Sequence, residues 1–314
     1  MVLDVDTGVD DALALLLAAN HPGLNLKAVT CVAGNVPLDR VVHNTLAVLD
    51  HAGAPTDLPV AAGCARPLLT EPVDASHVHG ATGLAGVDLP ASSSRTLVDS
   101  HAVDLLREVL HAAERPLTLV TLAPLTNIAM LFRLAPDLVR EKVARVVSMI
   151  GAVGSGNVTA AAEFNAFGDP EAASVVFGFG LPLTMYGWDV FRRVTVPLPD
   201  VARLTASQRP PAALAGRLLA AYREVFDLDE PYIGDAGAVC VALDPEGVTT
   251  QLRPTYVETA GRTRGATVVD QRPHFLDIDT DPTGPPAPEV SAAVDVDVLR
   301  YRGVFLRTLL GTDG

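Results

Sequence analysis

The sequence predicts an α/β protein of one domain, in which helices flank a mainly parallel central sheet and a small β-hairpin is added late in the chain. Two observations predict this class. Short apolar runs rich in β-branched residues alternate with helical patterns, and the runs are apolar throughout, as expected for strands covered on both faces. No linker or shift in composition divides residues 1–314, so we expect a single domain.

The elements follow one another in a regular order. The expected strands are the apolar runs at residues 2–5, 26–32, 116–122, 144–150 and 181–186. A helical pattern follows each of the first four, at residues 13–20, 38–53, 125–136 and 169–180. Strands joined by helices of this length form right-handed crossovers, which place them parallel in one sheet. Residues 197–211 and 280–288 are rich in chain-breaking residues and are expected to be loops, whereas 255–271 is expected to form the late hairpin.

The composition disfavours several classes of function. The formal net charge of −14 works against binding to nucleic acid or to anionic membranes, which depends on clustered Lys and Arg. No apolar run approaches the ~20 residues of a membrane span, and the first residues lack the pattern of a signal peptide. Cys31, Cys64 and Cys240 are odd in number and far apart, which favours buried free thiols over a disulfide or a zinc site. We therefore expect a soluble, cytoplasmic protein.

Polar side chains follow the ends of several expected strands. Ligands of open parallel sheets bind at the carboxyl ends of the strands, so these residues should lie at one edge. They are Asp6, Asp10 and Asp11 after the first strand, Asn35 after the second, Asn157, Glu163 and Asn165 after the fourth, and Asp189 after the fifth. The sequence therefore predicts a ligand site of carboxylates and amides at this edge.

Four aspartates, Asp4, Asp6, Asp10 and Asp11, fall close together at the start of the sequence. An acid in the first turn of a helix is stabilised by the helix dipole, which explains a single aspartate but not four. Converging carboxylates repel one another, and their pKa values rise unless a cation neutralises them. A hard divalent cation takes oxygen ligands, and calcium accepts a wider scatter of them than magnesium. The cluster therefore predicts a cation site and favours Ca²⁺.

The same stretch allows a second interpretation, as the nucleophile loop of a haloacid-dehalogenase-type phosphatase. Asp4 would then be the nucleophile and Asp6 the acid. Such enzymes hold the phosphate with a lysine that follows a later strand. The only lysines are Lys27 and Lys142, and neither follows a suitable strand end, so this interpretation is the weaker one.

Several spaced motifs occur along nearly the whole chain. They are DVDTGVDD at 4–11, AGN at 33–35, VHGATGL at 78–84, PLTN at 124–127, GNVTAAAEFNAFGDPEAA at 156–173 and ETAGRTRGATVVD at 258–270. Together they resemble the inosine–uridine-preferring nucleoside hydrolase family. The resemblance implies a Rossmann-like nucleoside hydrolase fold and a calcium-dependent enzyme that cleaves the N-glycosidic bond of ribonucleosides with water, releasing ribose and a free base. It also implies a homodimer or homotetramer.

The resemblance implies roles for individual residues as well. Asp6, Asp11 and Asp235 match the family's calcium ligands, and Leu122 falls where a backbone carbonyl completes the set. Asp6 also falls where the family has the general base that takes a proton from the calcium-bound water. The residues that match ribose-binding or pocket-lining positions are Asp10, Asn35, Met149, Asn157, Glu163 and Asn165. We expect Asp6, Asp10 and Asn165 to act in catalysis, because carboxylates and amide oxygens stabilise the positive charge that develops on the sugar.

The match breaks at Gly234, where the family carries a His immediately before the last calcium ligand, near the leaving base. A general acid typically contributes ~10²–10⁴-fold to the rate. Three interpretations follow: activation of the base by aromatic stacking, a proton donor elsewhere, or a calcium- and ribose-binding relative without turnover. The aromatic candidates are Tyr222, Phe226, Tyr232, Phe167 and Trp188, and the candidate donors are His77 and His79. Of these we expect Trp188, Tyr222, Tyr232 and His79 to contact the substrate.

Overall fold

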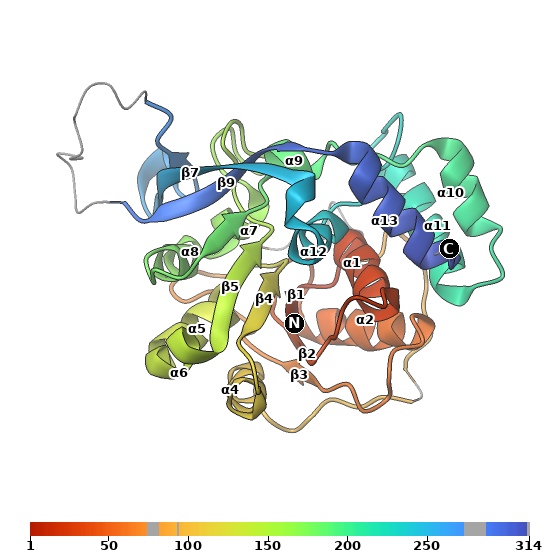
Figure 1. The fold of residues 1–314 in the computed structure, drawn as a ribbon, viewed down its shortest axis with the longest axis horizontal. Coiled ribbons are helices and arrows are strands. Elements are labelled where there is room, and N and C mark those ends of the chain that lie inside the picture. The colour runs from red at the N-terminus through yellow and green to blue at the C-terminus, as the bar shows by residue number, and fades with distance from the viewer. Residues whose placement is uncertain (74–81, 93, 273–286, 313–314) are drawn as a thin grey trace.

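A computed structural model describes residues 1–73, 82–92, 94–272 and 287–312. Within these ranges a nine-stranded sheet is bordered by helices on both faces (Figure 1). The strands are β1 (Val2–Val5), β2 (Ala28–Cys31), β3 (Val60–Ala62), β4 (Leu117–Thr121), β5 (Val143–Ser148), β6 (Leu183–Met185), β7 (Val248–Val257), β8 (Thr267–Val269) and β9 (Glu289–Val296). The helices are α1 (Val9–Asn20), α2 (Leu38–His51), α4 (Ala102–Ala112), α5 (Thr126–Leu134), α6 (Pro136–Lys142), α7 (Phe164–Gly168), α8 (Pro170–Phe177), α9 (Trp188–Phe191), α10 (Leu198–Thr205), α11 (Pro210–Val225), α12 (Ala236–Leu243) and α13 (Val298–Leu310).

The strand order of the sheet is β3-β2-β1-β4-β5-β6-β9-β7-β8. Neighbouring strands from β3 to β9 pair in parallel, whereas β7 runs antiparallel to both of its neighbours. The register aligns the carboxyl ends of the central strands. Val5 pairs with Cys31 of β2, and Thr121 of β4 pairs with Asp4 on one side and Ser148 on the other. The mainly parallel α/β fold expected from the sequence is thereby confirmed.

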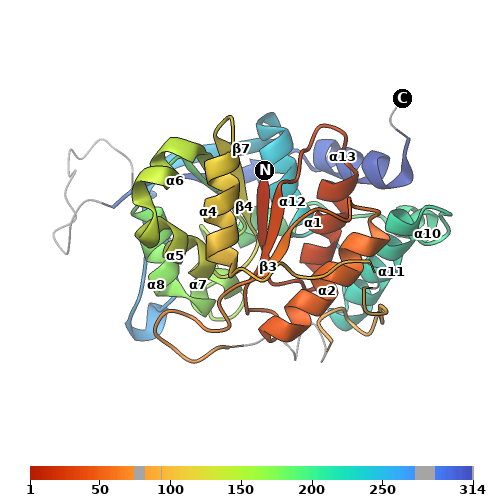
Figure 2. The same ribbon diagram turned by 90° about the horizontal axis from the view of Figure 1, so that it is seen from below.

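Two hydrophobic cores lie on the two faces of this sheet. Leu3 and Val5 face the core formed with α1, α2, α11, α12 and α13. Val2 faces the opposite core, which contains residues of α4, α5 and α8. Figure 2 shows these two groups of helices on opposite sides of the sheet. Because successive strand residues point to opposite faces, both sets must be apolar, and this explains the unbroken apolar runs of the sequence.

One segment expected to be a loop is helical. Residues 197–211 contain α10 and the beginning of α11. Pro199 lies in the first turn of α10, and Pro210 and Pro211 open α11. A proline in the first helical turn removes no intrahelical hydrogen bond, so these prolines mark helix starts. Of the other expected loop, 280–288, residues 280–286 lie outside the described part of the chain.

The hairpin expected at 255–271 is confirmed as β7 paired with β8, but it is not an appendage. β7 begins already at Val248 and pairs along most of its length with β9. β9 in turn pairs with β6 in parallel, so the hairpin continues the central sheet. Neither β9 nor the three-residue β3 was expected from the sequence. Their positions in the sheet depend on long-range pairing and not on a local pattern.

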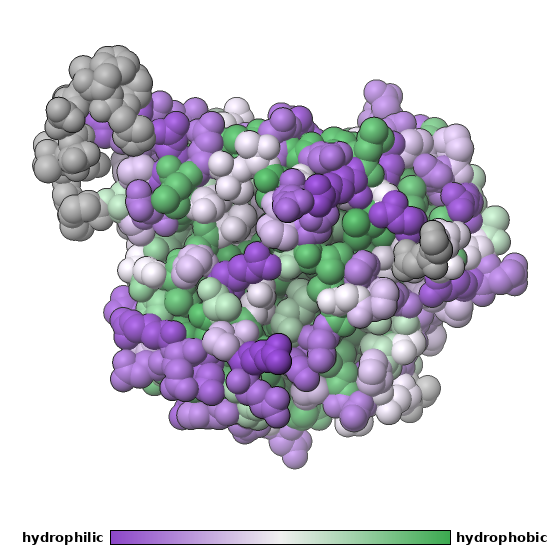
Figure 3. Space-filling model, viewed as in Figure 1, coloured by the Kyte–Doolittle hydropathy of each residue, from purple (hydrophilic) through white to green (hydrophobic). Residues whose placement is uncertain are grey.

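The described part of the chain contains no helix long and apolar enough to cross a membrane. All three cysteines are free thiols; Cys31 and Cys240 are buried, and Cys64 is half-buried. On the face shown in Figure 3, hydrophilic side chains gather over the end of the molecule that holds α5 and α6. Hydrophobic side chains elsewhere on this face occur in small groups among polar ones.

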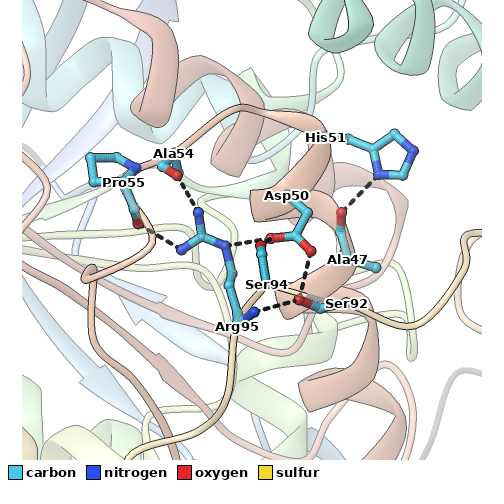
Figure 4. A network of polar contacts seen from close by, with 8 residues as sticks. All are labelled: Ala47, Asp50, His51, Ala54, Pro55, Ser92, Ser94 and Arg95. Carbon is cyan, nitrogen blue, oxygen red and sulfur yellow. Dashed lines mark hydrogen bonds and ion pairs between the residues drawn. The ribbon is translucent and has the colours of Figure 1, made fainter.

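A buried arginine fastens the segment before α4 to the end of α2 (Figure 4). The Nε atom of Arg95 donates to Asp50 Oδ1 at 2.8 Å, and its terminal nitrogens donate to two backbone carbonyls just after α2. The hydroxyls of Ser92 and Ser94 also donate to the Asp50 carboxylate. The Arg95 side chain is only 2% exposed, so these partners must compensate for the hydration that its charge loses on burial.

Replacing Arg95 by alanine should lower the free energy of unfolding by about 3 kcal/mol, because the Asp50 carboxylate and two carbonyls lose their donor. Arg66→Ala is the matched control. The Arg66–Glu71 pair is 62% and 83% exposed, and an exposed pair contributes only about 0–1 kcal/mol. Urea unfolding of both variants measures the difference. Equal losses would contradict the dependence on burial.

Candidate active site

A cavity of about 380 Å³ opens at the carboxyl edge of the sheet. Its walls come from α1, from the segments after β2, β4 and β5, and from the region between α9 and α12. The lining residues are Asp10, Asn35, Leu122, Met149, Asn157, Val158, Glu163, Phe164, Asn165, Trp188, Phe191, Tyr222, Phe226, Tyr232 and Asp235. Most residues expected to bind metal or substrate are therefore brought together here. Asp6 and Asp11 are buried beside the cavity, and His77 and His79 lie outside the described residues.

Three carboxylates meet where two helices begin. Asp10 and Asp11 lie in the first turn of α1, and Asp235 is the N-cap residue of α12. Each contributes a carboxylate oxygen, and these oxygens lie within 4.8 Å of one another. Asp11 and Asp235 are buried, and Asp10 is partly buried. The positive ends of the two helix dipoles offset part of the repulsion between these charges.

Asp6 lies next to this group and is held by Asn35. The backbone N–H of Asn35 donates to Asp6 Oδ2 at 2.7 Å, and its side-chain Nδ2 donates to Asp6 Oδ1 and Asp11 Oδ2, both at 3.1 Å. Gly34 permits this approach, because a Cβ atom there would lie only 2.0 Å from Asp6 Oδ2. The AGN motif thus fixes two of the buried aspartates at once.

The buried carboxylates carry a large electrostatic cost. Desolvation, followed by the charges of Asp11 and Asp10, raises the pKa of Asp6 well above its usual value. Desolvation and the Asp10 charge raise the pKa of Asp11 to about 7, and the same two causes raise that of Asp235 well above normal. Asp10 Oδ1 is buried and has no hydrogen-bond partner among the described residues. An oxygen-only donor set with this excess of negative charge fits a metal ion.

Two further polar side chains that line the cavity, Glu163 and Asn165, are held by backbone atoms. The Glu163 carboxylate accepts from the N–H of Gly151 at 2.7 Å and from two N–H groups in the first turn of α7. Burial raises the pKa of Glu163 to about 7. Asn165 Nδ2 donates to the carbonyls of Leu122 and Met149 at 3.1 and 2.9 Å. Asn165 also lines the cavity, and its amide is fixed by these two carbonyls.

Aromatic rings form the remaining wall. Tyr232 contacts Trp188, Phe191 and Tyr222 edge on, with ring centroids 6.2, 5.5 and 5.2 Å apart. Tyr222 stacks at a tilt on Phe226, with centroids 4.5 Å apart. Rings arranged in this way present faces and edges to a planar ligand.

Three lining residues were missed by sequence reasoning, namely Val158, Phe164 and Phe191. Phe164 directly follows Glu163, and Phe191 lies three residues after Trp188 on the same short helix, so spacing could have indicated both. One aromatic candidate does not line the cavity. Phe167 instead packs beside Gly265 of the hairpin, where a Cβ atom would lie 2.6 Å from Phe167 Cα.

Gly234 connects the aromatic wall to the acidic group. Its φ of +56° lies in the left-handed region, and a Cβ atom there would lie 2.6 Å from Asp10 Cβ and 3.0 Å from Phe191 Cζ. Glycine adopts this conformation without strain and leaves the space that the close approach requires. A histidine at this position is therefore incompatible with the observed backbone.

The phosphatase interpretation is wrong. Asp4 is 1% exposed, and its Oδ1 atom accepts from Thr30 Oγ1 at 2.6 Å and Asn127 Nδ2 at 2.8 Å. It does not line the cavity, so it has no access to a substrate there. Lys27 and Lys142 stand immediately before β2 and β5, at the opposite edge of the sheet from the cavity.

The fold and this cavity define an α/β protein with a group of carboxylates beside a cavity at the carboxyl edge of its parallel strands. Its sequence matches the family model described as inosine-uridine preferring nucleoside hydrolase over residues 1–302. The chain belongs to this family, and it is a nucleoside hydrolase.

Similar proteins support the assignment along the whole chain. A pyrimidine-specific ribonucleoside hydrolase, RihA, of Enterobacter sp. (strain 638) is 42% identical over 276 residues, which cover 86% of this chain and 87% of that protein. The solved structure of a plant nucleoside hydrolase is 32% identical with a TM-score of 0.87, covering 98% of both chains. That of a purine-preferring ribonucleoside hydrolase from Gardnerella vaginalis is 30% identical with a TM-score of 0.87, covering 99% of this chain and 98% of the other. The expected nucleoside hydrolase fold is confirmed.

In the presence of a chelator, the melting temperature should fall as the pH rises from 5 to 8. Raised carboxylate pKa values mean that the folded protein binds more protons than the unfolded chain between about pH 4 and 7, so stability is lost across this window as pH rises. An excess of divalent cation should restore stability most at pH 8. Asp235→Asn, which removes one of the repelling charges, should flatten the pH dependence in chelator. Thermal unfolding at pH 5 and pH 8, with chelator and with excess cation, measures these effects. A melting temperature of wild type that rises toward pH 8 in chelator would contradict the argument.

Proposed function

We propose that the protein hydrolyses the N-glycosidic bond of ribonucleosides to ribose and a free base, with Ca²⁺ as its cofactor. The observation that carries this proposal is the position of the three-aspartate group beside Glu163 and Asn165 in one cavity with an aromatic wall. Carboxylate and amide acceptors suit the hydroxyls of ribose, and aromatic rings suit a planar base. Membership of the nucleoside hydrolase family supports the same substrate class.

Asp6, Asp11, Asp235 and the Leu122 carbonyl are the proposed calcium ligands. Calcium fits because these oxygens come from widely separated positions and include both carboxylates and a carbonyl. Asp10 is a further candidate ligand beside its proposed role at the ribose hydroxyls, because its buried Oδ1 atom has no hydrogen-bond partner in the part of the chain that the structure describes. Once bound, the ion would orient ribose hydroxyls and a water molecule and lower the pKa of that water.

The reaction breaks the bond between the anomeric carbon and a nitrogen of the base. The electron pair of this bond leaves with the nitrogen, and the departing base takes up a proton from solvent to become the neutral free base. We propose that Asp6 removes a proton from the attacking water, while that water's oxygen bonds to the anomeric carbon. Asp6 is buried beside the acidic group, and Asn35 holds its carboxylate by two hydrogen bonds, which fixes its orientation for this step. The carboxylates of Asp10 and Glu163 and the Oδ1 atom of Asn165 would stabilise the positive charge on the sugar.

The leaving base would lie against the aromatic wall of Trp188, Tyr222 and Tyr232. Stacking there orients the base and excludes water from the breaking bond. A second candidate function, calcium and ribose binding without turnover, is favoured by one observation: the backbone at Gly234 leaves no space for the histidine that the family carries. The two functions differ in whether base is released.

Purified protein incubated with purine and pyrimidine ribonucleosides should release free base, detected by chromatography, and a calcium chelator should stop the release. Asp6→Asn should lower the rate by about 10²–10⁴-fold, because the amide cannot accept the proton. Asp39→Asn, at an exposed position on α2, is the control and should keep the wild-type rate. Release that persists in Asp6→Asn would contradict the mechanism, and no release from any nucleoside would favour the binding protein.

Ribonucleosides should be preferred over their 2′-deoxy counterparts by a factor on the order of 10⁴, because buried acceptors built for a hydroxyl lose their partner. Comparison of kcat/KM for a matched pair with the same base measures this factor. The base is the same in both substrates, so the contribution of its stacking on the aromatic wall cancels in the ratio of the two kcat/KM values. Equal turnover of the pair would contradict the assignment of Asp10 and Asn35 to the ribose hydroxyls.

A further inference from the structure

A threonine of the hairpin contacts the loop that follows β5. Thr267 on β8 is 7% exposed, and its Oγ1 atom accepts from the backbone N–H of Ala152 at 2.9 Å and donates to the carbonyl of the same residue at 2.7 Å. The two residues are 115 positions apart in the sequence. One hydroxyl thus satisfies both backbone groups of a loop residue outside its own strand.

This contact lies next to Glu163. Gly151, the residue before Ala152, donates its N–H to Glu163 Oε2 at 2.7 Å. Gly151 has a φ of +71°, and a Cβ atom there would lie 2.5 Å from Thr267 Cγ2, so the loop backbone rests directly on the threonine side chain. The carbonyl of Gly151 accepts from the N–H of Trp188 at 2.8 Å. Gly151 is therefore fixed between the hairpin, Glu163 and the aromatic wall.

The orientation of Glu163 depends on this arrangement. Its carboxylate has three backbone donors among the described residues, and two of them, Asn165 and Ala166, belong to the helix that Glu163 itself caps. Gly151 is the donor that comes from another element. Without it, the carboxylate would be held from one side only and could turn away from the cavity.

We propose that Thr267 is a positioning residue for sugar recognition: it holds the Gly151–Ala152 backbone so that the Gly151 N–H keeps Glu163 directed into the cavity. Thr267 itself does not line the cavity. The proposal rests on the proposed function, in which Glu163 binds the ribose. It gives the β7–β8 hairpin a part in substrate affinity beyond its place in the sheet.

The chain offers a matched control for a merely structural effect. Thr255 is fully buried on β7, in the same hairpin, and its hydroxyl donates to the carbonyl of Arg253 in its own strand at 3.0 Å. Valine has nearly the same shape as threonine but lacks the hydroxyl, so Thr267→Val and Thr255→Val remove comparable groups. Only the first removes contacts with the loop that leads to Glu163.

The sole tryptophan, Trp188, lines the cavity, so its fluorescence reports ribose binding without requiring turnover. Ribose is titrated into calcium-saturated wild type, Thr267→Val, Thr267→Ser and Thr255→Val, and KM and kcat are measured with one ribonucleoside. Thr267→Val should raise the Kd for ribose and the KM by about tenfold, the effect of one lost hydrogen bond. Thr267→Ser, which keeps the hydroxyl, and Thr255→Val should both stay within about twofold of wild type. The calcium-dependent rise in Tm should be the same in all four proteins.

The proposal would be overturned by an unchanged ribose Kd and KM in Thr267→Val, or by an equal rise of both values in Thr255→Val. A calcium-dependent Tm rise lost in Thr267→Val would also overturn it, by showing a general collapse of the site. Failure of the proposed function would give another result: wild type would then show neither a fluorescence change with ribose nor release of base.

Discussion

Buried negative charge is the constraint on which the rest of this site depends. Asp6, Asp11 and Asp235 are almost fully removed from water, and burial together with the charges of neighbouring carboxylates raises the cost of ionising each of them. Several features reduce that cost. The N-termini of α1 and α12 point their dipoles at the group, and Asn35 donates three hydrogen bonds to two of its members. The pKa values of all three stay raised despite these contacts, which is why we propose that a cation binds here.

The sheet brings this charge and the substrate groups to one place. Its parallel strands end in register, so that residues after β1, β2, β4 and β5 surround one cavity. The orientations of the polar side chains there are fixed by hydrogen bonds. Glu163 and Asn165 are each fixed by backbone N–H or carbonyl groups, and Thr267 in turn fixes the loop that carries one of these donors. Such fixed acceptors need no reorganisation when charge develops on a bound sugar.

Gly234 lies close to Asp10 and so connects the acidic group to the aromatic wall. A side chain at position 234 would push apart Asp10 and Phe191, which lie on either side of the glycine. The wall consists of rings around Tyr232, and the end of the cavity beside Gly234 has no room for an added histidine.

Local patterns in the sequence predict the parallel α/β class, the edge of the sheet at which the cavity lies, and the acids and amides that follow the strands. These features follow from periodicity and from the position of a residue relative to a strand end. Which residues come into contact depends on the packed structure. Asp4 and Asp6 are two positions apart, yet β1 ends between them, so Asp4 stays inside the sheet and Asp6 joins the acidic group. The pairing of β9 with β6 and the contact of Thr267 with Ala152 were likewise decided by packing, because contacts across more than a hundred residues leave no periodic trace in the sequence.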